Sequence, residues 1–158
     1  MPTTDEPGLE ALSADECRRL LTSVPLGRLA FTVGALPTIQ PMHFTVRGDE
    51  VLIPARRGGK VEAASRGAVL AFEVDEYDAS ARSGWSVTVV GPSRVLTDAA
   101  EVTALHQGVL PSWVPAADAC VVAVRIARMS GRRVIPTRPT SADVVMPPVR
   151  VTGELAQS

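Results

Sequence analysis

Short stretches in which apolar and polar residues alternate run through most of the sequence and predict a series of β-strands. In GRLAFTV, for example, Leu29, Phe31 and Val33 fall on one face of an extended chain. We expect six or seven strands, covering residues 27–33, 38–47, 51–55, 68–74, 84–91 with a continuation over 93–96, 120–126 and 132–135. The Gly91-Pro92 pair is typical of a β-bulge, and Pro41 favours an edge or a bulge for its strand.

Three segments predict helices between these strands. Ser13 and Glu16 have the spacing of a capping box, so a helix is expected to begin there, to run to about Ser23 and to end before Pro25. A short helix is expected over residues 60–65, and a longer one over 98–108 with an aspartate at its N-cap.

Turn signals join the strands into hairpins. Gly34-Ala35 and Gly48-Asp49 each lie between two apolar runs, which is where a chain most often reverses. Strands close together in sequence and joined by hairpins indicate an antiparallel sheet, most economically closed into a barrel. The predicted class is therefore mainly β with short helices (α+β). Residues 1–11 are expected to be a flexible lead, residues 12–136 the domain, and residues 137–158 an extended tail.

Composition narrows the function classes. Hydrophobic residues make up 46% and charged residues 21% of the 158 residues, which indicates a globular domain, and the net charge of −1 argues against general binding to nucleic acid or a membrane surface. Cys17 and Cys120 are far apart, so neither a disulfide framework nor a metal site is indicated. We see no signal peptide and no transmembrane segment, and expect a cytoplasmic location.

The loop Arg56-Arg57-Gly58-Gly59-Lys60 concentrates positive charge on bare backbone. Glycines allow backbone N–H groups to approach an anion closely, and the helix that begins here adds partial positive charge. Lys60 is the only lysine among 16 basic residues, although arginine-rich usage can simply reflect base composition. The loop is predicted to bind a phosphate group, and a solvated loop is the alternative.

Several motifs occur in an order that resembles a known family. The segments LSADECRRLL, GRLAFTV, PMHF, GGK, AFEVD, GWSVTVVG and SGRRV, within residues 12–135, are similar to those of pyridoxamine 5'-phosphate oxidase-like proteins, a flavin-binding group. The resemblance implies a six-stranded antiparallel split β-barrel, a homodimer, and FMN at the subunit interface. It also implies oxidation or reduction of a small molecule that the sequence does not identify.

The resemblance also implies roles for individual residues. Pro41 to Phe44 of the second predicted strand would lie along the flavin ring, the basic loop would bind the phosphate, and two tryptophans and a serine would line or close the cleft. In chain order these are Pro41, Met42, His43, Phe44, Arg56, Arg57, Gly59, Lys60, Trp85, Ser86 and Trp113, the last contributed from the partner subunit. His43 is the candidate catalytic residue, because an imidazole can exchange a proton near neutral pH. A structural histidine satisfied by backbone, and a Trp85 that packs in the core, are the alternatives.

One departure from the family pattern leaves the cofactor open. Family members usually carry Arg-Thr where this chain has Pro54 and Ala55. Arg56 and Arg57 could bind the FMN phosphate instead. Alternatively, the cleft takes a deazaflavin coenzyme whose longer acidic tail uses both arginines, or the protein is a dimeric ligand-binding module without a cofactor.

Overall fold

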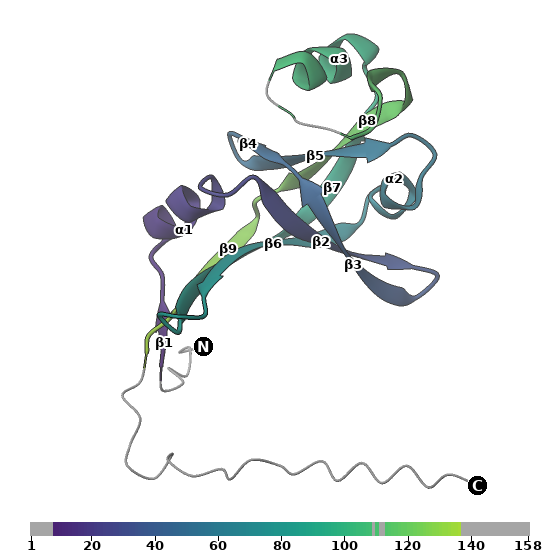
Figure 1. Cartoon of the computed structure of the whole chain (residues 1–158). Coiled ribbons are helices and arrows are strands. Elements are labelled where there is room, and N and C mark those ends of the chain that lie inside the picture. The colour runs from purple at the N-terminus through teal and green to yellow at the C-terminus, as the bar shows by residue number, and fades with distance from the viewer. Residues whose placement is uncertain (1–7, 109, 111–112, 137–158) are drawn as a thin grey trace, which may run out of the picture.

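An antiparallel β-sheet forms most of the molecule, as predicted (Figure 1). The computed structural model describes residues 8–108, 110 and 113–136, so the predicted tail over 137–158 and residues 1–7 of the predicted lead lie outside it. The strands are β1 Leu9–Ala11, β2 Leu26–Val33, β3 Leu36–His43, β4 Thr45–Arg47, β5 Glu50–Arg56, β6 Val69–Asp78, β7 Ser83–Leu96, β8 Ala119–Arg125 and β9 Arg128–Val134. The described residues thus hold nine strands where the resemblance implied six.

The strands pair in the order β3-β2-β6-β7-β8-β5-β4, and β9 joins β7 to β1. Every pairing is antiparallel. β3 also contacts β5, although no pairing joins these two strands in the described part of the chain. The path of strands therefore curls back on itself without closing, which is the split barrel that the family resemblance implied.

The long strand β7 belongs to both halves of the barrel. Its residues 83–92 pair with β6, and its last four residues pair with β8. Gly91 lies at the change of partner, where a Cβ atom would come within 1.8 Å of the carbonyl oxygen of Arg125. The register of β7 with β6 continues unbroken through Gly91-Pro92, so the predicted bulge is not found in this pairing. Gly91 is instead a crossing point that only glycine fits.

Two of the differences from the predicted boundaries concern the lead and the strand over 38–47. Leu9–Ala11, expected within the flexible lead, form β1 and pair with β9. The predicted strand over 38–47 is divided at Phe44 into β3 and β4. β3 ends the strand path and, among the described strands, pairs only with β2, which explains how it accommodates Pro41.

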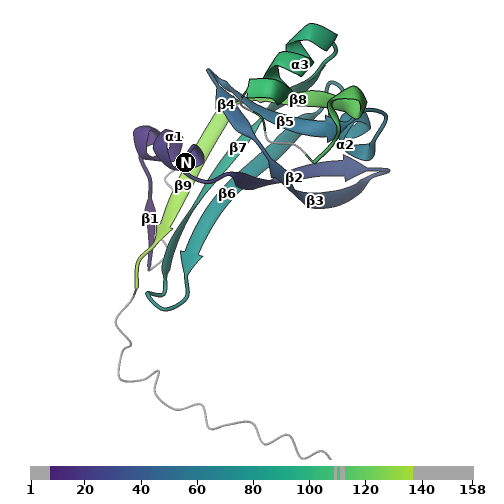
Figure 2. The same cartoon turned by 45° about the horizontal axis from the view of Figure 1, so that its top comes forward.

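The helices lie outside the sheet (Figures 1 and 2). They are α1 Ala14–Leu21, α2 Lys60–Ala64 and α3 Ala99–Gly108, with a 3-10 turn at Ala116–Asp118. The capping box is confirmed, because the Ser13 hydroxyl accepts from the Glu16 N–H and the Glu16 carboxylate accepts from the Ser13 N–H. Asp98 caps α3 by accepting the N–H of Glu101 at 2.8 Å.

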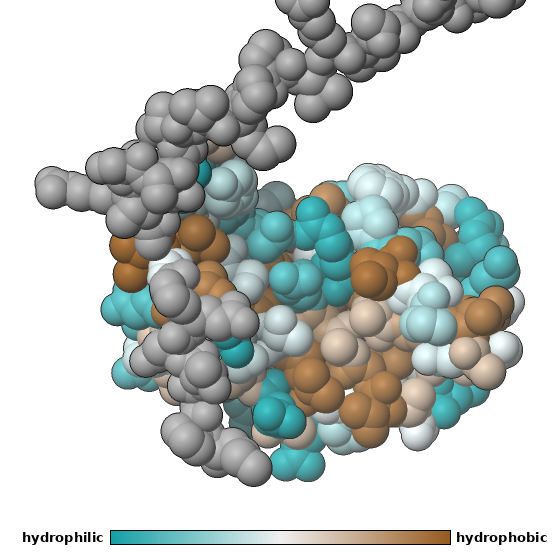
Figure 3. Space-filling model, turned by 90° about the horizontal axis from the view of Figure 1, so that it is seen from below, coloured by the Kyte–Doolittle hydropathy of each residue, from teal (hydrophilic) through white to brown (hydrophobic). Residues whose placement is uncertain are grey.

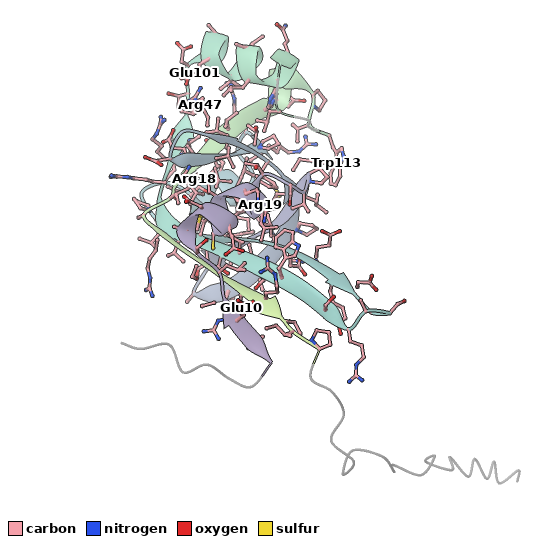
Figure 4. All side chains as sticks on the ribbon, turned by 90° about the vertical axis from the view of Figure 1, so that its left-hand side faces the viewer. Glu10, Arg18, Arg19, Arg47, Glu101 and Trp113 are labelled. Atoms are coloured by element: carbon pink, nitrogen blue, oxygen red, sulfur yellow. The ribbon has the colours of Figure 1, made fainter. Side chains whose placement is uncertain are left out.

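Polar contacts fix the outer helices to the barrel. Arg18 of α1 donates to the carbonyl of Gly48 and to Asp49 in the β4–β5 turn, at 3.1 and 2.9 Å. Arg47 of β4 pairs with Glu101 of α3 at 3.1 Å, and Figure 4 shows the two side chains together beside α3. Both helices therefore hold β4, the short strand at one end of the path.

Two clusters of buried side chains form the core. The larger lies inside the barrel and includes Leu29, Ile53 and Phe72, none of which is accessible to solvent. The smaller lies between α3 and the β5–β8 ladder and includes Leu52 and Leu105. β6, β7 and β9 extend beyond the barrel as an arm, which both views show (Figures 1 and 2).

Candidate functional site

A cavity of about 350 Å³ lies where β3 and β5 meet without pairing. Its walls come from β3, from the end of β5, from the loop into α2 and from the segment before β8. The lining residues are Gln40, Pro41, Met42, His43, Pro54, Ala55, Arg56, Gly59, Lys60, Val61, Trp113 and Val114. The cavity thus lies at the split in the barrel, and its volume is in the range of small-molecule binding sites.

The floor of the cavity is apolar. Met42, Pro54, Ala55 and Val61 are all buried, and none of them carries a polar side chain. Pro54 and Ala55 stand where the family resemblance expected an Arg-Thr pair that binds phosphate. This floor offers no hydrogen bond from a side chain, so the positively charged groups of the cavity are those at its rim.

The rim carries two cations, Arg56 and Lys60, both exposed. Neither side chain forms an ion pair with another described residue, whereas six other arginines do. Among the described residues that line the cavity, none is an aspartate or glutamate. The positive charge at the rim is therefore free to attract an anionic ligand.

Arg57 lies on the other side of the basic loop. Its backbone N–H donates to the carbonyl of Asp118 at 2.8 Å, and its guanidinium is 3.5 Å from the carbonyl of Ala119. It lines a separate recess of about 380 Å³ together with Glu62 and Arg66. The prediction that Arg56 and Arg57 act on one phosphate is therefore not supported by their placement.

His43 lies at the end of β3 and has one ring nitrogen without a partner. Nδ1 is buried, and no described group hydrogen-bonds to it. The alternative of a histidine satisfied by backbone therefore does not account for this atom. The ring meets Trp113 edge-on, with centroids 4.7 Å apart and planes at 83°. A group in the cavity that can donate to or accept from Nδ1 would satisfy it.

Trp113 lines the cavity of its own chain, although it was expected from the partner subunit. It is 78% exposed, and Figure 4 shows its side chain at the edge of the molecule. Since its contact with His43 covers only part of the ring, the exposed part can contact a ligand or a second protein.

Besides Arg57, three predicted site residues lie outside the cavity. Phe44 is buried and packs against Phe72 with centroids 4.8 Å apart, so it belongs to the core. Trp85 packs against the core and borders a third recess near Arg133. Ser86 lies in the middle of β7, paired on both sides with β6 and β9.

Some lining residues were not predicted as binding residues. Gln40 precedes Pro41 on an edge strand, so consecutive residues border the cavity and the expected alternation fails there. Val61 follows Lys60 in α2, and its apolar character gave no signal of a site. Val114 belongs to the proline-rich connection before β8, and the sequence pattern does not predict where that connection lies.

Other reactive groups offer no chemistry at this site. Burial is the main cause that raises the pKa of the Cys17 and Cys120 thiols, so both remain protonated near neutral pH. Among the described residues, no group of three or more histidine, cysteine or acidic side chains could hold a metal ion. No helix in residues 8–108 or 113–136 has the length and apolar character needed to cross a membrane.

Comparison with known proteins agrees with this architecture. The chain is 39% identical over 129 residues to the uncharacterized protein Rv0080 of Mycobacterium tuberculosis, which covers 78% of this chain and 84% of the relative. It is 34% identical to an FAD binding protein from Mycobacterium smegmatis, with a TM-score of 0.64, over 79% of this chain and 97% of that one. A FAD-binding protein from Mesorhizobium loti has the same fold at 23% identity and a TM-score of 0.63, over 80% and 98% of the two chains.

A sequence model for pyridoxamine 5'-phosphate oxidase matches residues 13–133, which span every strand except β1 and the last residue of β9. The matched range includes the residues that line the cavity, the basic loop and the crossing point of β7 at Gly91. The chain therefore belongs to the pyridoxamine 5'-phosphate oxidase family.

Proposed function

We propose that this protein binds a flavin, specifically FMN, in the cavity between β3 and β5 and acts as an FMN-dependent oxidoreductase on a small molecule. The observation that carries the proposal is the combination of an apolar floor with two unpaired cations at the rim. A flavin needs both features, because its ring is planar and largely apolar while its phosphate is strongly anionic. The FAD-binding protein at 34% identity also supports a flavin.

The rim suits the phosphate. Lys60 can give a charge-assisted hydrogen bond, and Arg56 can offer a planar pair of N–H donors. A Cβ at Gly59 would come within 3.0 Å of the carbonyl of Arg56, so glycine keeps this turn of the loop tight. Since Pro54 and Ala55 give no polar contact, Arg56 takes over the role that the family's Arg-Thr pair would have.

The inner part of the cavity suits the ring. Pro41 and Met42 supply an apolar surface, and Nδ1 of His43 supplies one hydrogen-bonding atom. Trp113 holds the histidine ring by edge-on contact. When bound, the flavin would supply the capacity to transfer a hydride or electrons. The chain's own residues would bind and orient it, exclude water from its face and hold or accept a proton at His43.

We favour FMN over FAD as the cofactor because the charged side chains of the cavity end at its rim. The adenylate of FAD would have to extend past Arg56 and Lys60, both of which are exposed. The alternative of a deazaflavin coenzyme rests on an acidic tail that would use Arg56 and Arg57 together. The separation of these two side chains into different recesses removes that reason.

We further propose that the protein is a homodimer whose interface includes β3. Large exposed apolar side chains gather on this part of the barrel, with Leu36 and Ile39 on β3 at 70% and 69% exposure and Val69 of β6 at 70%. Figure 3 shows apolar surface on the face seen from below, bordered by hydrophilic residues. Ile39 adjoins Gln40 in sequence, so the apolar edge continues to the cavity mouth. A second copy would cover both.

Titration of the purified protein with FMN, FAD and a deazaflavin coenzyme, followed by quenching of ligand fluorescence, tests the cofactor. We expect FMN to bind most tightly. Tighter binding of the deazaflavin coenzyme would identify that coenzyme, in place of FMN, as the cofactor. If none of the three bound, the result would favour the cofactor-free module that Pro54 and Ala55 suggest. Mass measurement in solution tests the dimer, and a monomer at micromolar concentration would exclude a stable interface at β3.

A further inference from the structure

The basic loop between β5 and α2 has two sides that border different recesses. Arg56, Gly59 and Lys60 line the cavity between β3 and β5. Arg57 and Gly58 line the recess of about 380 Å³, which also contains Arg66. Each side thus has two cations and a glycine, so charge composition alone does not explain why one side should bind an anion in preference to the other.

Glu62 distinguishes the two sides. Its side chain is directed into the Arg57 recess and is only 6% exposed. One carboxylate oxygen accepts the backbone N–H of Gly58, and the other accepts from the guanidinium of Arg66. The Gly58 N–H is the main cause that lowers the pKa of this carboxyl, and Arg66 and Arg57 add to it. Glu62 therefore remains ionised at neutral pH.

This carboxylate has the contacts that a bound phosphate would make on that side. It uses the bare backbone donor of the loop, and its charge offsets the neighbouring guanidinium groups. An anion that entered the Arg57 recess would meet a buried negative charge, which is strongly unfavourable in a partly desolvated site. The cavity between β3 and β5, by contrast, has no carboxylate among the lining residues that the structure describes.

We propose that Glu62 acts as an internal anion that fills the far side of the basic loop, so that the loop binds an external anion only on the face of Arg56 and Lys60. Glu62 is thus a positioning residue, which acts through the loop without touching the ligand. The inference rests on the proposed function for the identity of the anion as the flavin phosphate. It does not need that identity for its test, because any compact polyanion should respond in the same way.

The matched variants Arg56→Gln and Arg57→Gln separate the two faces. They change adjacent residues of the same type in the same loop, and both side chains are exposed, so neither variant should impair folding. With inorganic pyrophosphate as the probe, measured by calorimetry, we expect Arg56→Gln to weaken binding by about tenfold and Arg57→Gln to change it by less than about twofold. Equal losses would overturn the proposal, and so would a wild-type protein that does not bind pyrophosphate.

Glu62→Gln tests the role of the charge itself. Glutamine has the same shape and can still accept the Gly58 N–H, but it leaves Arg57 and Arg66 without a counter-charge. We expect this variant to bind a second pyrophosphate, and the additional Arg57→Gln change should abolish that second binding. A merely structural role would lower the thermal stability and leave the stoichiometry at one, which would overturn the proposal. If Glu62→Gln does not fold, the comparison of Arg56→Gln with Arg57→Gln still decides whether the loop binds an anion on one face only.

The outcome is independent of the cofactor proposal. A protein that binds pyrophosphate on the Arg56 face but does not bind FMN would refute the proposed function and leave the role of Glu62 intact. Conversely, FMN binding with equal losses in the two arginine variants would keep the function and refute the role of Glu62.

Discussion

Replacement of Lys60 by glutamine provides a direct measure of the proposed phosphate contact. The side chain is exposed and forms no ion pair with the described residues, so its removal leaves no carboxylate without a partner. Any loss of affinity therefore reports on the ligand. A hydrogen bond to a charged group contributes about 1.5–3 kcal/mol. Because solvent screens an exposed ammonium, we expect the lower end, which corresponds to about a tenfold loss of FMN affinity.

Riboflavin, which has the same ring as FMN but no phosphate, supplies the control. Fluorescence quenching should give a weaker FMN complex for Lys60→Gln and an unchanged riboflavin complex, and the wild-type preference for FMN over riboflavin should fall by the same factor. Higher ionic strength should reduce the difference between the two proteins. Equal losses for FMN and riboflavin would show that Lys60 supports the fold of the cavity, and no loss for FMN would remove Lys60 from the site.

Further predictions concern stability, the cavity rim and pH. Gly91→Ala should lower the free energy of unfolding by about 3 kcal/mol or more, because the new Cβ would lie 1.8 Å from the backbone oxygen of Arg125. An unchanged midpoint of urea denaturation would contradict the tight crossing of β7 at Gly91. Trp113→Ala should change stability by less than about 0.5 kcal/mol but should weaken FMN binding severalfold, and unaltered affinity would exclude Trp113 as a ligand contact. The pKa of Glu62 is lowered in the folded state from 4.5, so its stabilising contribution is present above that value and is lost as pH falls through the folded pKa. The denaturation midpoint of Glu62→Gln should therefore fall less between neutral and acidic pH than that of the wild type. Parallel dependence of the two midpoints on pH would contradict this.

The parts of the fold that sequence predicted are those set by local chemistry. The capping box at Ser13 fixes the start of α1, because both of its hydrogen bonds lie within four residues. Gly48 adopts φ 58°, which favours glycine, so the β4–β5 turn was predictable from one residue. The order of the motifs then placed the chain in its family, which supplied the split barrel.

The parts that escaped prediction depend on contacts distant in sequence. β1 is a strand only because it pairs with β9, more than 120 residues later. β6 continues through Asp75, Glu76 and Asp78, whose charges disfavour a strand, because β7 pairs with it along its whole length.

The candidate site was predictable to a similar degree. Lys60 and the end of β3 were found from sequence because they belong to contiguous motifs. The placement of Arg57 depends on its contacts with Asp118 and Ala119, neither of which the loop sequence reveals. The contact of His43 with Trp113 joins residues 70 positions apart, and no local pattern indicates it.

The visible absorption spectrum of the protein after incubation with FMN and removal of free ligand tests the central proposal most directly. The cavity between β3 and β5 predicts a yellow protein that retains about one flavin per chain, with a spectrum shifted from that of free FMN by the apolar floor. A colourless protein that is folded and still has the spectrum of a flavin-free chain would contradict it.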